Sequence, residues 1–118
     1  MNVLRIVANL EATESGLAEA DAFYRDLIGL DVLMDHGWIR AYGSVARMTV
    51  QVSVATEGGN GTPVPHLSIE VDDLDAALAR VGKAGIALEY GPTREPWGVR
   101  RFYVRDPLGR LVNVLQHE

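Results

Sequence analysis

The strongest constraint on this chain is an arrangement of strand and helix patterns that occurs twice. In the first half, an apolar, β-branched run at 4–10 precedes a helical pattern that ends at Gly29. In the second half, a similar run at 66–71 precedes a helical pattern that ends at Gly85. Each half continues with three segments whose composition is typical of strands. This order predicts two βαβββ modules in tandem.

Matching residues support an internal duplication. Val7 aligns with Val71, and Leu10 aligns with Leu74, at the same offset of 64 residues. One such module has an incomplete core and open sheet edges, so the two are expected to pack together. We therefore predict one domain, 1–118, with module 1 at about 1–55, a flexible glycine-rich linker at about 56–65 and module 2 at about 66–118.

Individual elements can be placed from apolar periodicity and turn residues. The second helix is expected at 74–85, with Asp72 or Asp73 as its N-cap. A turn is expected around Trp97, between Pro96 and Gly98. The predicted strands after the helices lie at 30–36, 38–43, 46–54, 86–91, 99–106 and 110–116.

Composition excludes several classes of function. The chain has no cysteine, which rules out disulfides, thiolate zinc sites and cysteine nucleophiles. Its net charge is -5, whereas nucleic-acid binding requires a basic face. No segment has the length of a membrane span or the pattern of a signal peptide. We therefore expect a cytoplasmic protein with no nucleic-acid or membrane partner.

Three segments resemble the vicinal oxygen chelate superfamily, which includes glyoxalase I, bleomycin-resistance proteins and extradiol dioxygenases. They are FYRDLIGLDV, HLSIEVDDLDAA and RFYVRDPLGRLVNVLQ, and a fourth, EPWGVRRF, is most similar to the bleomycin-resistance branch. The resemblance covers essentially the whole chain. It implies an α+β fold in which the tandem βαβββ modules form a cupped mixed sheet. It also implies a homodimer, because a second subunit usually completes the cup in such relatives.

The resemblance also implies four metal positions, at which metal-dependent relatives carry mainly His and Glu. The corresponding residues are Asn2, Gln51, His66 and Asn113. A shift of two residues would replace Gln51 by Thr49. None of these residues is a carboxylate, whereas divalent cations gain most of their affinity from anionic or several imidazole ligands. Glu70 is the substitute ligand on the strand face of His66. We expect no metal and no other cofactor.

Strand alternation predicts a cup lined by amides, hydroxyls and aliphatic groups, which suits a small molecule. Trp38 and Trp97 each lie in a turn-like context where an indole can close over a flat ligand, with a core or interface position as the alternative. Arg100 and Arg101 point to opposite faces of one strand, and the inward one is expected to bind a ligand carboxylate or Glu70. The candidate ligand-binding residues are Trp38, Gln51, His66, Trp97, Arg101 and Asn113.

These observations predict a metal-independent protein that binds and sequesters an amphipathic aromatic compound, such as an antibiotic. The alternative is an enzyme of the same fold, a lyase, isomerase or dioxygenase, with or without a divalent metal. In that case His66 is the expected general base, and the sequence indicates no other catalytic residue. A third reading is a binding or regulatory module without a detoxifying role. One scaffold of this kind carries many chemistries, so the resemblance does not decide between them.

Overall fold

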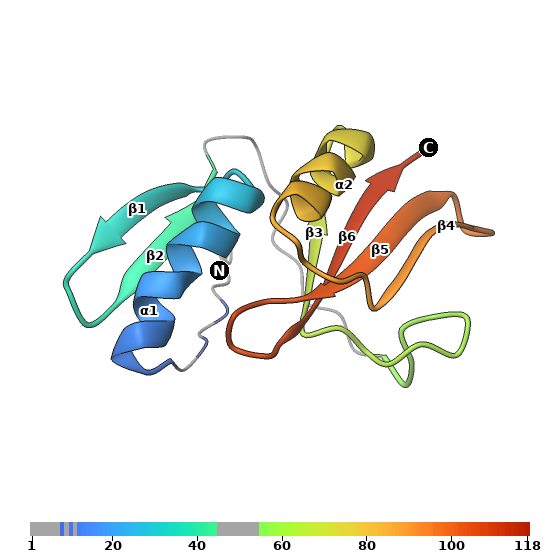
Figure 1. The fold of residues 1–118 in the computed structure, drawn as a ribbon. Coiled ribbons are helices and arrows are strands. Elements are labelled where there is room, and N and C mark those ends of the chain that lie inside the picture. Colours follow the sequence, from blue (N-terminus) through green and yellow to red (C-terminus); the bar gives the residue numbers. More distant parts are fainter. Residues whose placement is uncertain (1–7, 9, 11, 45–54) are drawn as a thin grey trace, which may run out of the picture.

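The computed structural model describes residues 8, 10, 12–44 and 55–118 (Figure 1). The elements are α1 (Glu14–Ala20), η1 (Asp21–Leu27), β1 (Asp31–Asp35), β2 (Arg40–Gly43), β3 (Leu67–Glu70), α2 (Leu74–Lys83), β4 (Tyr90–Glu95), β5 (Val99–Arg105) and β6 (Leu111–His117). η1 is a π-helical continuation of α1, and β1 pairs with β2 in an antiparallel hairpin. The strands expected at 4–10 and 46–54 lie outside the described residues, apart from Ala8 and Leu10. No helix within the described ranges is long and apolar enough to cross a membrane.

The second half forms the βαβββ module that the sequence predicts. Its four strands make one sheet in the order β3–β6–β5–β4. β3 and β6 are parallel, and the other neighbours are antiparallel. α2 connects β3 to β4 and packs on one face of the sheet (Figure 1). The α+β class with a mixed sheet is therefore confirmed.

The start of α2 and the glycines that follow both helical segments agree with the sequence, although α2 ends at Lys83 rather than at 85. Asp73 is the N-cap of α2, and its carboxylate accepts a hydrogen bond from a backbone N–H in the first turn. Thr13 caps α1 in the same way. Gly29 and Gly85 follow the two helical segments with φ values of 89° and 70°, a conformation that favours glycine. The two halves thus share their start and stop signals.

One strand begins later than expected. The sequence predicts a strand at 86–91, whereas β4 runs over Tyr90–Glu95. Ile86 belongs to the end of α2 instead, because its N–H donates to the Val81 carbonyl (3.1 Å) and its side chain packs against the core. The strand can contain Pro92, since β4 is an edge of the sheet and an edge strand does not need every backbone donor.

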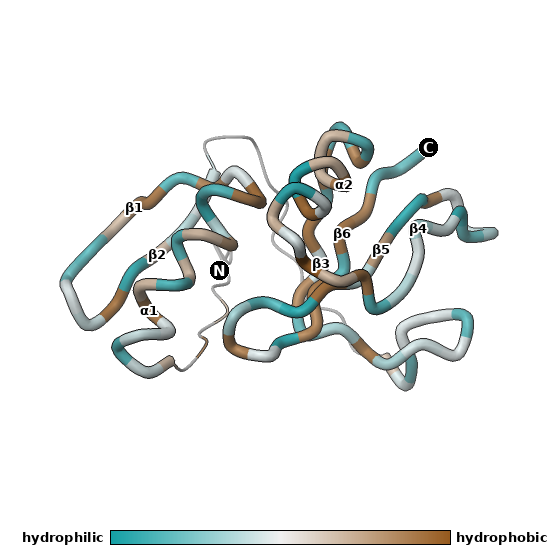
Figure 2. Tube along the Cα trace, in the orientation of Figure 1, coloured by the Kyte–Doolittle hydropathy of each residue, from teal (hydrophilic) through white to brown (hydrophobic). Residues whose placement is uncertain are grey.

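A single hydrophobic core joins the two halves of the chain. Figure 2 shows apolar residues concentrated along β3, β6 and β5. The buried core residues are Ala20, Phe23, Tyr24, Leu27, Leu74, Val81, Phe102, Val104, Val112 and Val114. Two hydrogen bonds also link the halves: the Tyr24 hydroxyl donates to Asp106 (2.6 Å), and Arg80 donates to the Leu27 carbonyl (3.3 Å). The modules of one chain therefore pack against each other through their helices.

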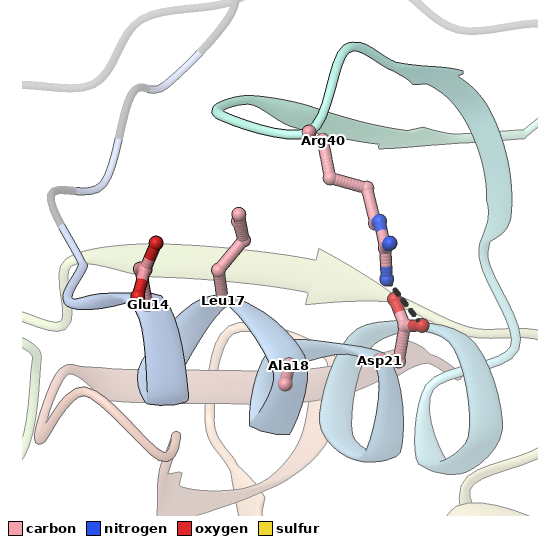
Figure 3. Close-up of a pocket in the computed structure, with 6 residues that line it drawn as sticks. Glu14, Leu17, Ala18, Asp21 and Arg40 are labelled. Atoms are coloured by element: carbon pink, nitrogen blue, oxygen red, sulfur yellow. Dashed lines mark hydrogen bonds and ion pairs between the residues drawn. The ribbon is translucent and has the colours of Figure 1, made fainter.

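Asp21 fastens the β1–β2 hairpin to the first helix. Its carboxylate accepts hydrogen bonds from the Tyr42 hydroxyl and from the Arg40 guanidinium, and Figure 3 shows Arg40 reaching down from the hairpin. These donors favour the charged carboxylate, so the pKa of Asp21 is lowered, with the hydrogen bond from Tyr42 as the largest cause. Burial, together with the Asp21 carboxylate, raises the pKa of Tyr42 to about 12.

We expect Asp21→Asn to lower the melting temperature at neutral pH and to matter less in acid. A carboxyl group whose pKa is lowered by folding stabilises the protein above its ordinary pKa of 3.8, and this stabilisation is lost as the pH falls through the folded-state value. The difference in melting temperature between wild type and variant should narrow below pH 3.8. Asp31→Asn, at the exposed start of β1, is the matched control. A difference that stays constant down to the lowest pH of folding would contradict this role.

Candidate functional site

Two hollows of similar size open on the described surface. The first, about 350 Å³, lies between α1 and the β1–β2 hairpin (Figure 3). Its facing charged groups, Asp21 and Arg40, already bind each other, so neither is left to hold a ligand. The second, about 340 Å³, lies against the four-stranded sheet and is called the sheet pocket below. Its lining residues are Asn60, Gly61, Thr62, Pro63, Glu89, Tyr90, Tyr103, Arg105 and Leu111.

The sheet pocket lies on the face of the sheet opposite the core. Val112 and Val114 are fully buried in the core, so alternation directs Asn113 to the other face. Tyr103 pairs with Asn113 across β5 and β6, and directly paired side chains lie on one face. The pocket side of β5 is therefore the side of Tyr103 and Arg101.

This orientation separates the two neighbouring arginines, as the sequence predicts. Arg101 faces the pocket side and is 4% exposed. Arg100 faces the helix side, where its guanidinium donates to Asp75 of α2 (2.8 Å). Alternation alone leaves open which arginine points inward, and the strand pairing decides it.

One wall of the sheet pocket comes from the 57–62 loop, which the sequence analysis expects to be a flexible linker. The structure instead shows a hydrogen-bonded turn. The Gly58 N–H donates to the Thr62 carbonyl (2.8 Å), and the Thr62 N–H donates to the Gly59 carbonyl (3.0 Å). A Cβ on Gly58 would lie 2.5 Å from the Tyr103 hydroxyl oxygen. Gly58 therefore permits the close approach of the loop to the sheet, while the flexibility of the linker stays a prediction.

Arg101 ties this loop to the sheet. Its Nη1 donates to the Gly58 carbonyl (2.7 Å), its Nη2 to the Gly59 carbonyl (3.3 Å) and its Nε to the Glu95 carboxylate (3.1 Å). The guanidinium carbon lies 5.4, 5.1 and 5.0 Å from the ring centres of Tyr90, Trp97 and Tyr103. The expected pairing with Glu70 is wrong: the tight β4–β5 turn brings Glu95 beside Arg101 instead.

The sequence did not identify Glu95, just as it did not identify Tyr90, Tyr103 and Asn60 among the candidate ligand-binding residues. The Glu95 side chain is fully buried, and it accepts hydrogen bonds from the Tyr90 hydroxyl (2.6 Å) and the Asn60 amide as well as from Arg101. A buried carboxylate requires such compensation. The signal in the sequence is the position of Glu95 directly before the Pro96–Gly98 turn, with Arg101 on the returning strand.

The structure separates the two tryptophans within one chain. Trp97 lies in the β4–β5 turn, is 51% exposed and packs against Arg101. Trp38 lies in the β1–β2 loop and is 79% exposed. The β1–β2 loop and the β4–β5 turn lie at opposite ends of the molecule (Figure 1). Neither tryptophan, nor any other described residue predicted to bind the ligand, is among the residues that line the sheet pocket, but Trp97 lies beside Gly59 and Arg101, next to the loop that forms one wall of the pocket.

Asn113 and His66 lie on the same face as the sheet pocket. Asn113 is 6% exposed, its Nδ2 donates to the Ser68 hydroxyl (3.1 Å), and its Oδ1 has no hydrogen-bond partner among the described residues. His66 is exposed, and its Nδ1 accepts a hydrogen bond from the Leu111 N–H (3.4 Å). An amide oxygen of this kind can accept a hydrogen bond from a donor group.

The described residues do not fit a divalent cation. Glu70, the expected substitute ligand, binds His117 (2.6 Å). The two metal positions that the structure describes hold the neutral amide of Asn113 and the imidazole of His66, whose Nδ1 already accepts a hydrogen bond. Asn2 and Gln51 lie outside the described residues. Within the described part of the chain, no group of three His, Cys, Asp or Glu side chains could hold a metal.

Solved structures with the same fold include proteins of different function. TnmS3, an antibiotic binding protein from Streptomyces sp. CB03234, is 26% identical, with 86% of each chain covered and a TM-score of 0.62. A lactoylglutathione lyase from Agrobacterium tumefaciens is 24% identical, with 85% of this chain and 84% of that chain covered and a TM-score of 0.59. TioX from Micromonospora sp. ML1 is 22% identical, with 86% and 87% covered and a TM-score of 0.55. The last two support the fold alone.

Sequence comparison gives the family directly. A search of curated proteins finds no match for this chain. Residues 7–114, in contrast, match the family described as the Glyoxalase/Bleomycin resistance protein/Dioxygenase superfamily. That match covers most of the chain and agrees with the mixed sheet of the second module, and this chain therefore belongs to the Glyoxalase/Bleomycin resistance protein/Dioxygenase superfamily.

Proposed function

We propose that this chain is a metal-independent small-molecule-binding protein, which sequesters an amphipathic aromatic compound such as an antibiotic. The observation that carries the proposal is the sheet pocket, where Tyr90 and Tyr103 lie with ring centres 5.3 Å apart. Its volume of about 340 Å³ is within the range of small-molecule sites. The fold shared with an antibiotic binding protein adds support.

The chemistry of the pocket wall defines the kind of ligand. The two tyrosine rings and Leu111 supply apolar area for a flat molecule. Asn60 contributes a polar group from the loop. At the edge of the pocket, Arg105 and Glu89 form a half-exposed ion pair (3.4 Å), and the opposite charges of this pair cancel. A ligand with an aromatic body and a polar edge fits this arrangement best.

The enzyme alternative depends on His66, which the structure gives little catalytic support. Its one hydrogen bond among the described residues is from the Leu111 backbone, and no carboxylate in that part of the chain orients it as a general base. Turnover that is lost in His66→Ala would nevertheless favour an enzyme over a sequestering protein. Tight binding without turnover would favour sequestration.

The first test is ligand binding by wild type and Trp97→Ala, measured by calorimetry with a panel of two- and three-ring aromatic compounds that includes anthraquinone-2-sulfonate. Loss of an indole that stacks on the ligand should weaken binding by roughly 1–3 kcal/mol, because apolar area and ring contact are both lost. The melting temperature should change little, since Trp97 is half-exposed.

Two results would count against this role. Unchanged affinity in a folded Trp97→Ala protein would remove Trp97 from the site. Destabilisation by about 3–5 kcal/mol would indicate a core residue instead. Trp38→Ala is the matched control. Because the β1–β2 loop that carries Trp38 lies at the opposite end of the molecule, this change should alter affinity only if the hairpin of a second copy reaches the pocket.

We expect weak metal binding. A site with an amide at Asn113 and one imidazole at His66 lacks the anionic ligands that divalent cations require. Calorimetric titration with nickel, zinc, manganese and iron(II) should give no dissociation constant below roughly micromolar, about 8 kcal/mol of binding free energy. A nanomolar constant for any of the four metals would overturn the metal-independent proposal.

We also infer a homodimer. The β1–β2 hairpin exposes four large apolar side chains, those of Val32, Leu33, Met34 and Trp38, and a neighbouring copy would remove them from water. Light scattering at micromolar concentration should report twice the 12.9 kDa of one chain. Trp38→Glu, which places a charge on this surface, should increase the monomer fraction. A wild-type protein that is monomeric at this concentration would refute the dimer.

A further inference from the structure

We propose that Arg101 is a positioning residue that holds the 57–62 loop as a fixed wall of the sheet pocket and thereby sets the width of the pocket for its ligand. This inference rests on the proposed function, because ligand binding in the sheet pocket is itself a proposal. It differs from the expectation that Arg101 binds a ligand carboxylate.

The hydrogen bonds of Arg101 are already used within the protein. Nε, Nη1 and Nη2 each donate to a protein acceptor, and Nη1 also contacts the Tyr103 hydroxyl (2.8 Å). The acceptors include the carbonyls of Gly58 and Gly59, which immediately precede Asn60, the first loop residue that lines the pocket. The guanidinium therefore fixes the backbone at the point where the wall begins.

The same ion pair positions both tyrosines of the pocket. Glu95 accepts from the Tyr90 hydroxyl (2.6 Å) and from the Asn60 amide. The Tyr103 hydroxyl contacts Arg101 and lies 2.9 Å from the Thr62 hydroxyl. The loop, Tyr90 and Tyr103 are thus each connected to Arg101 or to its partner Glu95. Loss of the guanidinium would release the loop from both tyrosines.

Arginine is required here because its donors point in three directions within one plane. Nε faces β4, and the two Nη atoms face the loop. The planar group can also lie against Tyr90, Trp97 and Tyr103, all within 5.4 Å. A lysine ammonium is a compact charge that cannot reach Glu95 and both loop carbonyls at once. Arg101→Lys therefore keeps the charge and removes the clamp.

A fixed wall should strengthen binding because the ligand does not have to order the loop. The test compares Arg101→Lys with Arg100→Lys, a change on the same strand whose side chain binds the exposed Asp75 instead. Both variants carry Trp38→Phe, so that Trp97, above the guanidinium, is the only tryptophan. Hydrogen exchange of the Gly58 and Thr62 amides and Trp97 fluorescence are measured without ligand, and affinity is measured with anthraquinone-2-sulfonate.

In Arg101→Lys we expect the Gly58 and Thr62 amides to exchange at least about tenfold faster, while the β5–β6 amides keep their protection. Affinity for anthraquinone-2-sulfonate should fall about tenfold, because the loop must then be ordered on binding. Arg100→Lys should match the Trp38→Phe parent in both measurements. Unchanged loop exchange in Arg101→Lys, or faster exchange with unchanged affinity, would overturn the proposal.

Gly59→Ala provides a second route that leaves the buried charge in place. A Cβ there would lie 2.7 Å from the Trp97 indole and 3.3 Å from Arg101 Nη2, at a φ of 89° that disfavours a side chain. Gly59→Ala should also speed exchange in the loop and weaken ligand binding. If Arg101→Lys does not fold, Gly59→Ala tests whether the fixed loop strengthens binding. If the wild type binds no aromatic probe, the proposed function fails, and loop exchange alone then decides whether Arg101 is a clamp.

Discussion

The pairing of β5 with β6 is the interaction on which the rest of the structure depends. Seven residue pairs hold the two strands in register, from Val99 with His117 to Arg105 with Leu111. Since side chains alternate along a strand, this register sends one set of residues to the helices and the next set to the sheet pocket. A register shift of one residue would exchange the apolar and polar faces of the strand. Core and site are therefore specified together.

The polar face of the four-stranded sheet carries the two described metal positions without a carboxylate at either of them. A carboxylate in the middle of the face would attract a cation, whereas Asn113 is neutral and is held by Ser68. The buried charge lies further along the sheet, at Arg101 and Glu95, where it stabilises a wall. The buried charge of Arg101 and Glu95 thus holds the loop that forms one wall of the sheet pocket, while the charged groups that line the pocket itself, Arg105 and Glu89, lie at its edge.

Much of the fold could be predicted from the sequence because its signals are local. Asp73 and Gly85 mark the ends of α2 by capping and by positive φ, which depend only on near neighbours. The 57–62 loop could not be predicted in the same way. Glycines are equally suited to a flexible linker and to close packing, and the difference depends on Tyr103, some forty residues away in the chain.

The ion-pair partner of Arg101 also could not be predicted from local sequence signals. Alternation gives two possible faces for the β5 arginines, and Glu70 and Glu95 are both acidic residues within a strand. The choice depends on the pairing of β4 with β5, which places Thr93 opposite Arg101 and Glu95 opposite Val99, and which no periodicity encodes. The positions of Trp38 and Trp97 relative to each other could not be predicted either, because the composition of a turn does not show at which end of the molecule the turn lies.

The contact between the Tyr24 hydroxyl and Asp106 has a consequence for the order in which the chain acquires its structure. Phe23, Tyr24 and Leu27 share the core with residues of β5 and β6, and the bond from Tyr24 to Asp106 spans 82 positions of the chain. Because a chain is synthesised from its N-terminus, the first helix emerges from the ribosome well before these packing partners. Its apolar side stays exposed to water until β5 and β6 have emerged, and a chain that stops before them exposes the surface that makes nascent proteins aggregate.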